Sequence, residues 1–330
     1  ASDVYKRQVF RQYDHEVGIR TVVKPGFDAS VLRLDNGKFL SVKIDGNPKH
    51  CYLNPRDGAI GCFEEACRNV VCTGAKPIGM VDHLQFGNPE DPEIFWTFME
   101  SLEGLTDFAK FLKIPCVGGK VSFYNETPEG PIKPTPLIGV LGIINKTPLH
   151  PTPPAPDDYL IIVGKTKNEL GGSEYFEYIH DFIGGICPTV DFKSSKSNML
   201  TVLSLIKQNL VKSAHDCSKG GISIAVSEMS ILGTIGCDID IGKSPSEENL
   251  NSEQLLFSES HSRYLLVVTK KNIKKTKQIL SKNKIPFGVL GNFTSDQISL
   301  KHKSKRLVKI NVDVAQRKYF NALKEILDNG

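Results

Sequence analysis

The sequence has 330 residues, of which 40% are hydrophobic and 24% are charged, and its formal net charge is +4. This is the composition of a globular protein with room for two packed domains, and it excludes a disordered chain. No apolar run approaches the length of a membrane span, and the N-terminus lacks the apolar segment of a signal peptide, so we expect no membrane association.

The basic residues and the cysteines narrow the functional class. Basic residues cluster at 270–277 and 301–306, but no aromatic side chains alternate with them, so we expect no nucleic-acid binding. The eight cysteines include no Cys-x-x-Cys pair, and several lie within apolar patterns. They predict reduced core residues of a cytoplasmic protein rather than a disulfide framework or a zinc site.

The first eight residues, Ala-Ser-Asp-Val-Tyr-Lys-Arg-Gln, fit no pattern further along the chain. We expect them to be a non-native remnant of sequencing or cloning, and the native chain to begin further upstream. Residues 9–147 are predicted to form the first domain. Its expected elements, in chain order, are strands at 21–23, 29–34 and 39–44, a helix at 58–73, a strand at 78–84, a helix from residue 91 and a strand at 137–144.

Five prolines lie between residues 145 and 158, each without a backbone donor, which predicts an extended linker at 148–158. Residues 159–330 then alternate between helical and strand patterns, as in a layered α/β domain. Ser173 is expected to cap the first helix of this domain. The predicted fold class is therefore mixed, α+β in the first domain and α/β in the second.

The segment 115–125 gathers small and polar residues behind a short apolar run. Gly118 and Gly119 carry no Cβ and can adopt a positive φ, which predicts a turn. Lys120 adds a charge and Ser122 a hydroxyl, so the segment offers donors suited to phosphate and carbonyl oxygens. The alternative is an ordinary glycine turn between two strands.

Acidic and basic residues also occur within predicted strands. Asp82 interrupts the apolar strand 78–84, where a carboxylate is costly unless it meets a metal, a cation or a hydrogen-bond donor. A ribose or an adenine amino group would serve, and an ion pair or a loop cap is the alternative. Lys43, Asp45 and Asn47 point to one face of a strand end and could bind Mg-phosphate, although polar strand ends are common without a ligand.

Two glycine-rich segments precede predicted helices, where free amides and the helix dipole favour anions. Their candidate residues are Gly171, Gly172 and Ser173 in the first segment, and Ser218, Gly220 and Gly221 in the second. His215 beside Asp216 is compatible with acid–base chemistry, but no nucleophile is near in sequence, so a structural histidine is the alternative. Glu259 lies in a predicted helix-to-strand turn. The chain contains neither a Walker loop nor a Gly-x-Gly-x-x-Gly helix start, so the residues alone predict only a phosphorylated ligand.

Several motifs together resemble one family of enzymes. They are QYDHEV at 12–17, DGNP at 45–48, Asn69 with TGAKP at 73–77, DHLQFGNPE at 82–90, GKVSFYN at 119–125, PTP at 134–136, LGGSEY at 170–175, HDCSKGG at 215–221 and LFSES at 256–260. In this order they are similar to the second half of the synthetase subunit of the phosphoribosylformylglycinamidine synthase family, within the aminoimidazole-ribonucleotide (AIR) synthetase superfamily. The resemblance extends from about residue 9 to the end of the chain.

The resemblance implies an ATP- and Mg²⁺-dependent ligase of purine biosynthesis. In this family, ATP phosphorylates the amide oxygen of formylglycinamide ribonucleotide, and ammonia from a glutaminase subunit displaces the phosphate to give the amidine. Family members contain two such halves whose N-terminal sheets join into a barrel, so the first domain is expected to be a half-barrel. The implied partners are the glutaminase subunit, a small accessory subunit, and either the missing first half or a second copy of this chain.

The resemblance also carries roles to individual residues. Asp82 and Gly119 match positions that bind ATP, and Ser122 matches one that contacts the substrate, so we expect one pocket between the domains that Asp82 and Ser122 both line. Lys120 stands where the family has a Mg²⁺-binding Asn, so either that metal contact is absent here or the lysine sets its own charge against phosphate. The weaker candidates for the cleft are Lys43, Asp45, Lys120, Gly171, Gly172, Ser173, His215, Asp216, Ser218, Gly220, Gly221 and Glu259. Of these, the glycine segments at 171–173 and 218–221 and the turn at 259–261 are carried over by analogy with the other half.

The family's catalytic histidines belong to the first half, so no catalytic residue is expected here and the chain is expected to be inactive alone. Two other interpretations stay open. One is a non-catalytic half that binds nucleotide and completes the barrel. The other is a different superfamily enzyme, such as AIR synthetase, selenophosphate synthetase or thiamine-phosphate kinase.

Overall fold

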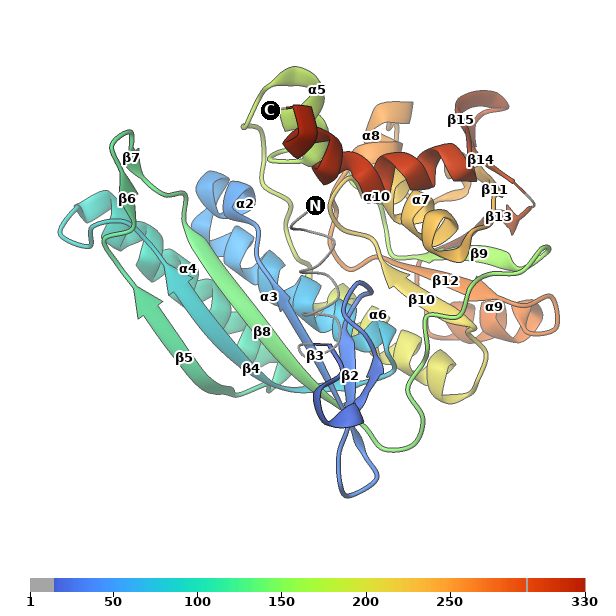
Figure 1. The fold of residues 1–330 in the computed structure, drawn as a ribbon, viewed down its shortest axis with the longest axis horizontal. Helices are drawn as coiled ribbons and strands as arrows, with labels where there is room; N and C mark the ends of the chain where they lie inside the picture. The colour runs from blue at the N-terminus through green and yellow to red at the C-terminus, as the bar shows by residue number, and fades with distance from the viewer. Residues whose placement is uncertain (1–14, 295, 330) are drawn as a thin grey trace. The chain divides into compact units, whose positions relative to one another are not determined.

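The computed structural model describes residues 15–294 and 296–329, and their side chains except at 17 and 323–329. The remnant predicted at residues 1–8 and the first three residues, 12–14, of the motif QYDHEV lie outside this part. The chain divides into two compact units, Ala1–Pro151 and Thr152–Gly330. Each unit is described by itself, with the labels of Figure 1.

The first unit contains a six-stranded sheet with strand order β1-β2-β3-β8-β4-β5. All neighbouring strands are antiparallel except β4 and β5, which run parallel. The elements are η1 (Val17–Ile19), β1 (Thr21–Val23), β2 (Ser30–Arg33), β3 (Phe39–Asp45), α2 (Pro48–Leu53), α3 (Pro55–Cys72), β4 (Lys76–Gln85), α4 (Pro92–Leu112), β5 (Cys116–Ser122), the short pair β6 (Glu126–Thr127) and β7 (Gly130–Pro131), and β8 (Thr135–Ile144).

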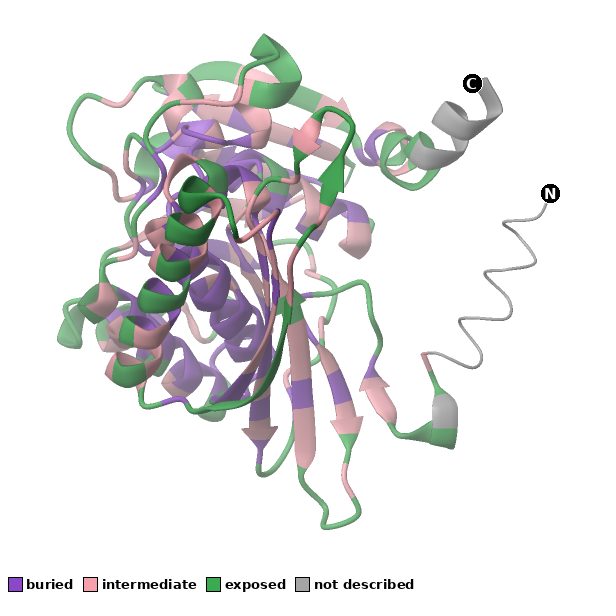
Figure 2. Ribbon diagram, turned by 90° about the vertical axis from the view of Figure 1, so that its left-hand side faces the viewer, coloured by how far each residue is buried: buried purple, intermediate pink, exposed green. Residues whose placement is uncertain are grey.

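Helices α2, α3 and α4 all lie on one side of this sheet (Figure 1). Helix α3 begins where Asn54 accepts a hydrogen bond from the Asp57 amide at 3.0 Å, with proline in the first turn. Phe63 of α3 and Phe108 of α4 pack edge to face with ring centroids 5.4 Å apart. The result is a helical layer whose inner member, α3, is almost wholly buried (Figure 2).

The other side of the sheet, which we call the open face, carries no helix of the described part of this unit (Figure 1). Successive side chains of a strand point to opposite faces of the sheet. Ser41 accepts a hydrogen bond from Thr73 at the end of α3, on the helical side, so its neighbours in β3 point to the open face. The apolar side chains of the open face are Leu32, Leu40, Val42, Ile44, Val81, Leu137, Leu141 and Ile143. Ile44 is 63% exposed and the other seven are partly exposed, so the described part of this unit leaves the open face uncovered.

The second unit contains a seven-stranded sheet with strand order β10-β12-β9-β13-β11-β14-β15. Its elements are β9 (Tyr159–Val163), α5 (Glu174–His180), α6 (Phe192–Lys207), β10 (Ser213–Asp216), α7 (Gly221–Gly233), β11 (Cys237–Asp240), η2 (Ile241–Lys243), α8 (Ser252–Phe257), β12 (Tyr264–Val268), α9 (Ile273–Lys282), β13 (Phe287–Phe293), β14 (Gln297–His302), β15 (Lys305–Asn311) and α10 (Val312–Asn329). Among the described strands of this sheet, only β11 and β14 pair in parallel. Strands β9 and β12 are buried on both faces, which explains their uninterrupted apolar sequences.

Helix α6 offers a first test of the local structure. Its N-cap Asp191 accepts a hydrogen bond from the Ser194 amide at 2.7 Å, and hydrogen bonds from Ser194 lower the pKa of this carboxyl below its usual 3.8. We expect Asp191→Ala to cost about 1 kcal/mol of unfolding free energy at neutral pH. Because the folded pKa is lowered, this difference should be complete above about pH 5 and disappear as the pH falls through the lowered pKa.

Urea denaturation of both proteins across this pH range measures the difference. A cost that stayed constant down to about pH 2 would show that the charge of Asp191 contributes nothing to the cap. Asp191→Asn is the matched control, because it keeps the acceptor oxygen and should show little pH dependence.

Candidate functional site

Asp82 and Gly119 are directly paired across the parallel strands β4 and β5. A Cβ built on Gly119 would lie 2.3 Å from Oδ1 of Asp82, so the residue at 119 must be glycine for the carboxylate to stay where it is. The prediction of a glycine turn at 118–119 is wrong: both glycines lie inside β5 and neither has a positive φ. Glycine is needed here for the close approach of a side chain, which local sequence does not distinguish from a turn.

A cavity of about 520 Å³ lies beside Asp82, on the helical side of the sheet. It is lined by Met80, Asp82, Leu102, Leu105, Thr106, Ala109, Lys110, Lys113, Ile114, Pro115 and Cys116. The walls are mainly apolar, with one carboxylate as an acceptor and two lysines for anionic groups. Such a cavity suits a flat heterocycle with an amino group, including a nucleobase.

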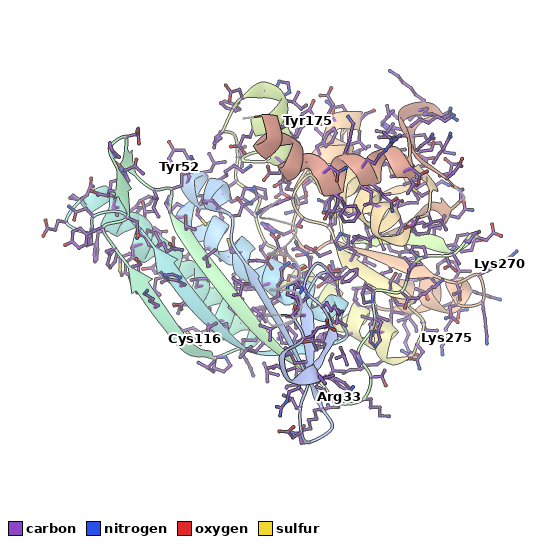
Figure 3. All side chains as sticks on the ribbon, viewed as in Figure 1. Arg33, Tyr52, Cys116, Tyr175, Lys270 and Lys275 are labelled. Atoms are coloured by element: carbon purple, nitrogen blue, oxygen red, sulfur yellow. The ribbon has the colours of Figure 1, made fainter. Side chains whose placement is uncertain are left out.

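Cys116 is the one exposed cysteine among the eight, and it lies on β5 next to this cavity (Figure 3). Its Sγ is 3.5 Å from Oδ2 of Asp82. Loss of hydration raises the pKa of the Cys116 thiol above its usual value, and the negative charge of Asp82 raises it further. The thiol is therefore accessible but reacts slowly at neutral pH.

Ser122 and Lys120 project from the opposite face to Asp82. Lys120 pairs with His83 and Ser122 with Gln85, and successive strand residues alternate between faces. The expectation that Asp82 and Ser122 line one pocket is therefore wrong for this sheet: they occupy neighbouring strands but point to its two sides. Asn125 fixes the end of β5 by donating to the backbone oxygen of Ser122 at 2.9 Å.

Lys43 and Asp45 point toward the helices and interact with protein groups. The Lys43 ammonium is 3.5 Å from the Asp45 carboxylate, which also accepts a hydrogen bond from Asn69 of α3 at 3.2 Å. Asn47 caps α2 by accepting from the His50 amide. This geometry favours the structural alternative over the Mg-phosphate site.

In the second unit, a carboxylate of the protein itself binds to backbone amides at the two glycine-rich segments. One Glu259 oxygen accepts hydrogen bonds from the amides of Glu174 and Gly220, both at 2.8 Å, at the starts of α5 and α7. Glu259 is 3% exposed. These helix starts therefore already bind an anion, and it belongs to the protein.

The glycines of these segments are required by packing. A Cβ on Gly171 would lie 2.0 Å from the carbonyl oxygen of Ile186, and one on Gly221 would lie 2.5 Å from that of Leu256. Gly172 has a φ of 66° and donates to the carbonyl of Gly184 at 3.0 Å. In both segments the backbone therefore packs directly against the backbone of another part of the chain.

The polar residues of the same segments also serve the fold. Ser173 caps α5, as predicted, by accepting from the Phe176 amide at 3.2 Å, and the backbone oxygen of Ser218 accepts from the Gly221 amide at 3.0 Å. His215 Nε2 is 3.1 Å from Glu228 of α7, whereas Asp216 is 4.0 Å from its other ring nitrogen. A structural histidine that hydrogen-bonds to Glu228 accounts for this contact.

The residues that sequence reasoning missed are those of α4 that line the cavity. Leu102, Thr106 and Lys110 recur every four residues along one side of the helix. That spacing was available as a signal, but the apolar members fit an ordinary core-facing stripe equally well. Among the residues described, no helix is both long and apolar enough to cross a bilayer.

The fold and this site define a two-domain protein with a one-sided mixed sheet in the first unit and a layered sheet in the second. The family description "AIR synthase related protein, N-terminal domain" matches residues 26–144, and "AIR synthase related protein, C-terminal domain" matches residues 155–303. The chain belongs to the AIR synthase related family, which confirms the predicted superfamily and mixed α/β fold class.

Named relatives are similar along nearly the whole chain. Phosphoribosylformylglycinamidine synthase subunit PurL of Thermococcus sibiricus is 42% identical over 327 residues, covering 98% of this chain and 45% of that protein. The PurL subunit of Methanocaldococcus jannaschii is 40% identical over 334 residues, with the same coverage. The chain thus spans about half the length of these relatives.

Solved structures share the fold. Thermotoga maritima PurL complexed with FGAR gives a TM-score of 0.77 at 19% identity, over 90% of this chain and 49% of that chain. A chain of a HypE–HypF complex gives 0.66 at 14% identity, over 93% of this chain and 98% of that chain. The same two-domain fold therefore occurs both as half of a longer chain and as nearly a whole one.

Proposed function

We propose that this chain is the second half of a phosphoribosylformylglycinamidine synthase, an ATP-dependent carbon–nitrogen ligase. The observation that carries the proposal is similarity to PurL proteins along 98% of the chain. In the proposed reaction the amide oxygen of formylglycinamide ribonucleotide is phosphorylated, and ammonia then replaces the phosphate. Phosphorylation turns a poor leaving group into a good one, and Mg²⁺ would neutralise charge on the transferred phosphoryl group.

The residues of this half would bind and orient ligands rather than react. Asp82 would accept a hydrogen bond from the amino group or ribose of ATP, with the base in the apolar cavity, and Gly119 leaves room for that carboxylate. Ser122 would contact the substrate, formylglycinamide ribonucleotide, on the open face. Because β5 is an edge strand, a ligand can pass around it at Gly118 and Gly119, where no side chain projects.

The open face supports a partner for the first unit. A large uncovered apolar surface marks an interaction site. Because the PurL relatives are about twice as long, we propose that the rest of their chain covers it, with a second copy of this chain as the alternative. Ammonia would come from a glutaminase subunit, in an assembly that includes a small accessory subunit.

Nucleotide binding is expected to protect Cys116 from alkylation. Under native conditions iodoacetamide should label this thiol alone, since the other seven cysteines are buried, and saturating ATP should slow labelling about tenfold by covering the cavity mouth. Mass spectrometry of peptides after timed labelling gives the rate. An unchanged rate at saturating ATP contradicts the assignment of the cavity.

Asp82→Asn is the matched variant for this experiment. Removing the negative charge lowers the pKa of the Cys116 thiol, so labelling without ATP should become faster. Loss of the proposed acceptor should weaken ATP binding, so protection at a fixed ATP concentration should decrease. These opposite changes separate a lost ligand contact from a general loss of structure.

The uncovered open face should make the isolated chain self-associate. Ile44→Lys introduces a charge at its most exposed apolar side chain, so we expect a shift from dimer or aggregate toward monomer in light scattering with little change in folding stability. Tyr178→Lys, at an 88% exposed site in the other unit, is the control and should leave association unchanged. A monomeric unmodified chain would contradict the prediction.

The ligase proposal itself is tested by adding the missing half. The isolated chain should release no ADP with formylglycinamide ribonucleotide and ammonia, and adding the separately produced first half of a PurL relative should restore release. Activity of the chain alone would show that its own residues suffice. Absence of activity in the mixture, with both halves folded and bound, would contradict the assignment.

A further inference from the structure

The open face of the first unit is apolar at one end and polar at the other. The polar end is formed where β4 and β5 finish and β8 begins, by His83, Gln85, Lys120, Ser122 and Thr135. The ammonium of Lys120 has no ion-pair partner among the residues described, and it is exposed on an edge strand. It is therefore a fixed positive charge available to a ligand.

His83 supplies a second sign of an unfilled site. It pairs directly with Lys120 across the two strands, and its Nε2 is buried without a hydrogen-bond partner in the described part of the chain. A buried polar nitrogen without a partner is costly and calls for a group that the protein itself does not provide. The hydroxyl of Ser122, two residues beyond Lys120 on the same face, adds a neutral donor.

These groups do not fit a magnesium ion. Mg²⁺ in proteins is held by oxygen ligands that include carboxylates, and an ammonium can neither ligate nor tolerate a second cation beside it. None of the strand residues of β2, β3, β8, β4 and β5 on the open face is Asp or Glu; the nearest strand carboxylate, Asp82, points to the other side. The hydrogen-bond donors at this end of the open face therefore suit an anion.

We propose that Lys120 binds a phosphate group of the ligand directly, with Ser122 as a neutral donor, so that this half of the site binds phosphate without a metal ion. The inference rests on the proposed function and deepens it: any Mg²⁺ of the complete enzyme would be held by other residues. Both a nucleotide polyphosphate and a ribose 5-phosphate present this chemistry.

The test compares phosphate binding with and without Mg²⁺. Amide NMR spectra of the isotope-labelled chain are recorded during titration with ATP, and separately with ribose 5-phosphate, in EDTA and in excess Mg²⁺. We expect at least one ligand to shift the amides of residues 118–122 in EDTA, with an affinity that Mg²⁺ changes less than threefold. The ligand that binds more tightly identifies the source of the phosphate.

Lys120→Asn is expected to reduce the affinity in EDTA about tenfold, because it removes one charge-assisted contact. Lys76→Asn is the matched control, since it makes the same change at the far end of β4 and should leave the affinity unaltered. A requirement for Mg²⁺, or equal affinities of Lys120→Asn and the unmodified chain, overturns the inference.

The outcomes also separate this inference from the proposed function. If neither ligand shifts residues 118–122 while ATP still protects Cys116, the inference is wrong and the nucleotide cavity stands. If neither ligand shifts these residues and ATP gives no protection, the proposed nucleotide site is wrong as well.

Discussion

Replacing Arg263 by alanine is expected to lower the free energy of unfolding of the second unit by about 4 kcal/mol. The side chain is fully buried, and its guanidinium donates to the carbonyl oxygens of Ser258 at 2.6 Å and Ser260 at 2.8 Å, and to Thr166 Oγ1 at 3.1 Å. Removing it leaves three buried acceptors without this donor, and it also leaves a cavity in the turn before β12.

Chemical denaturation, with hydrogen exchange of the β9 and β12 amides as a local readout, measures this loss. Arg263→Met keeps most of the volume and removes the donors, so it separates hydrogen bonding from packing and should retain most of the cost. Arg306→Met, at an exposed site on β15, is the control and should change stability by less than about 0.5 kcal/mol. A fully stable Arg263→Met would show that the hydrogen bonds contribute little.

Removal of the Glu259 carboxylate is expected to have the second large effect on the free energy of unfolding. We expect Glu259→Ala to cost about 3 kcal/mol, because two amides at helix starts lose a buried charged acceptor. Glu259→Gln keeps an oxygen acceptor in the same position and should cost less than half as much. Thermal or urea denaturation gives both values.

An added anion provides a direct check on the role of Glu259. In Glu259→Ala the amides of Glu174 and Gly220 are free to take an external ion, so millimolar phosphate should recover part of the lost stability. The same concentration should leave the unmodified protein unchanged. Equal responses of the two proteins would show that Glu259 does not act as an internal anion.

Much of the fold follows from patterns that are local in the sequence. The apolar pattern predicted the helix at 58–73, observed as α3 (Pro55–Cys72), and the helix predicted from residue 91 is observed as α4 (Pro92–Leu112). The serine expected to cap the first helix of the second unit also does so. Caps and periodic stripes are set by neighbours within a few residues, and this is why they can be predicted.

The site was less predictable because its geometry depends on the register between distant segments. Whether Gly119 forms a turn or makes room for a carboxylate depends on its pairing with Asp82, which lies 37 positions earlier in the chain. The same register sends Asp82 and Ser122 to opposite faces, which spacing along one strand cannot show. Likewise Glu259 meets Gly220 only because two turns of the second unit pack together.

The uncovered apolar side of the first sheet affects how much of this polypeptide accumulates in the cell. Chaperones and proteases act on polypeptides that display such surfaces, so molecules made in excess of their counterpart would be removed. The steady-state amount of this polypeptide would then follow the synthesis of whatever covers it rather than its own translation rate.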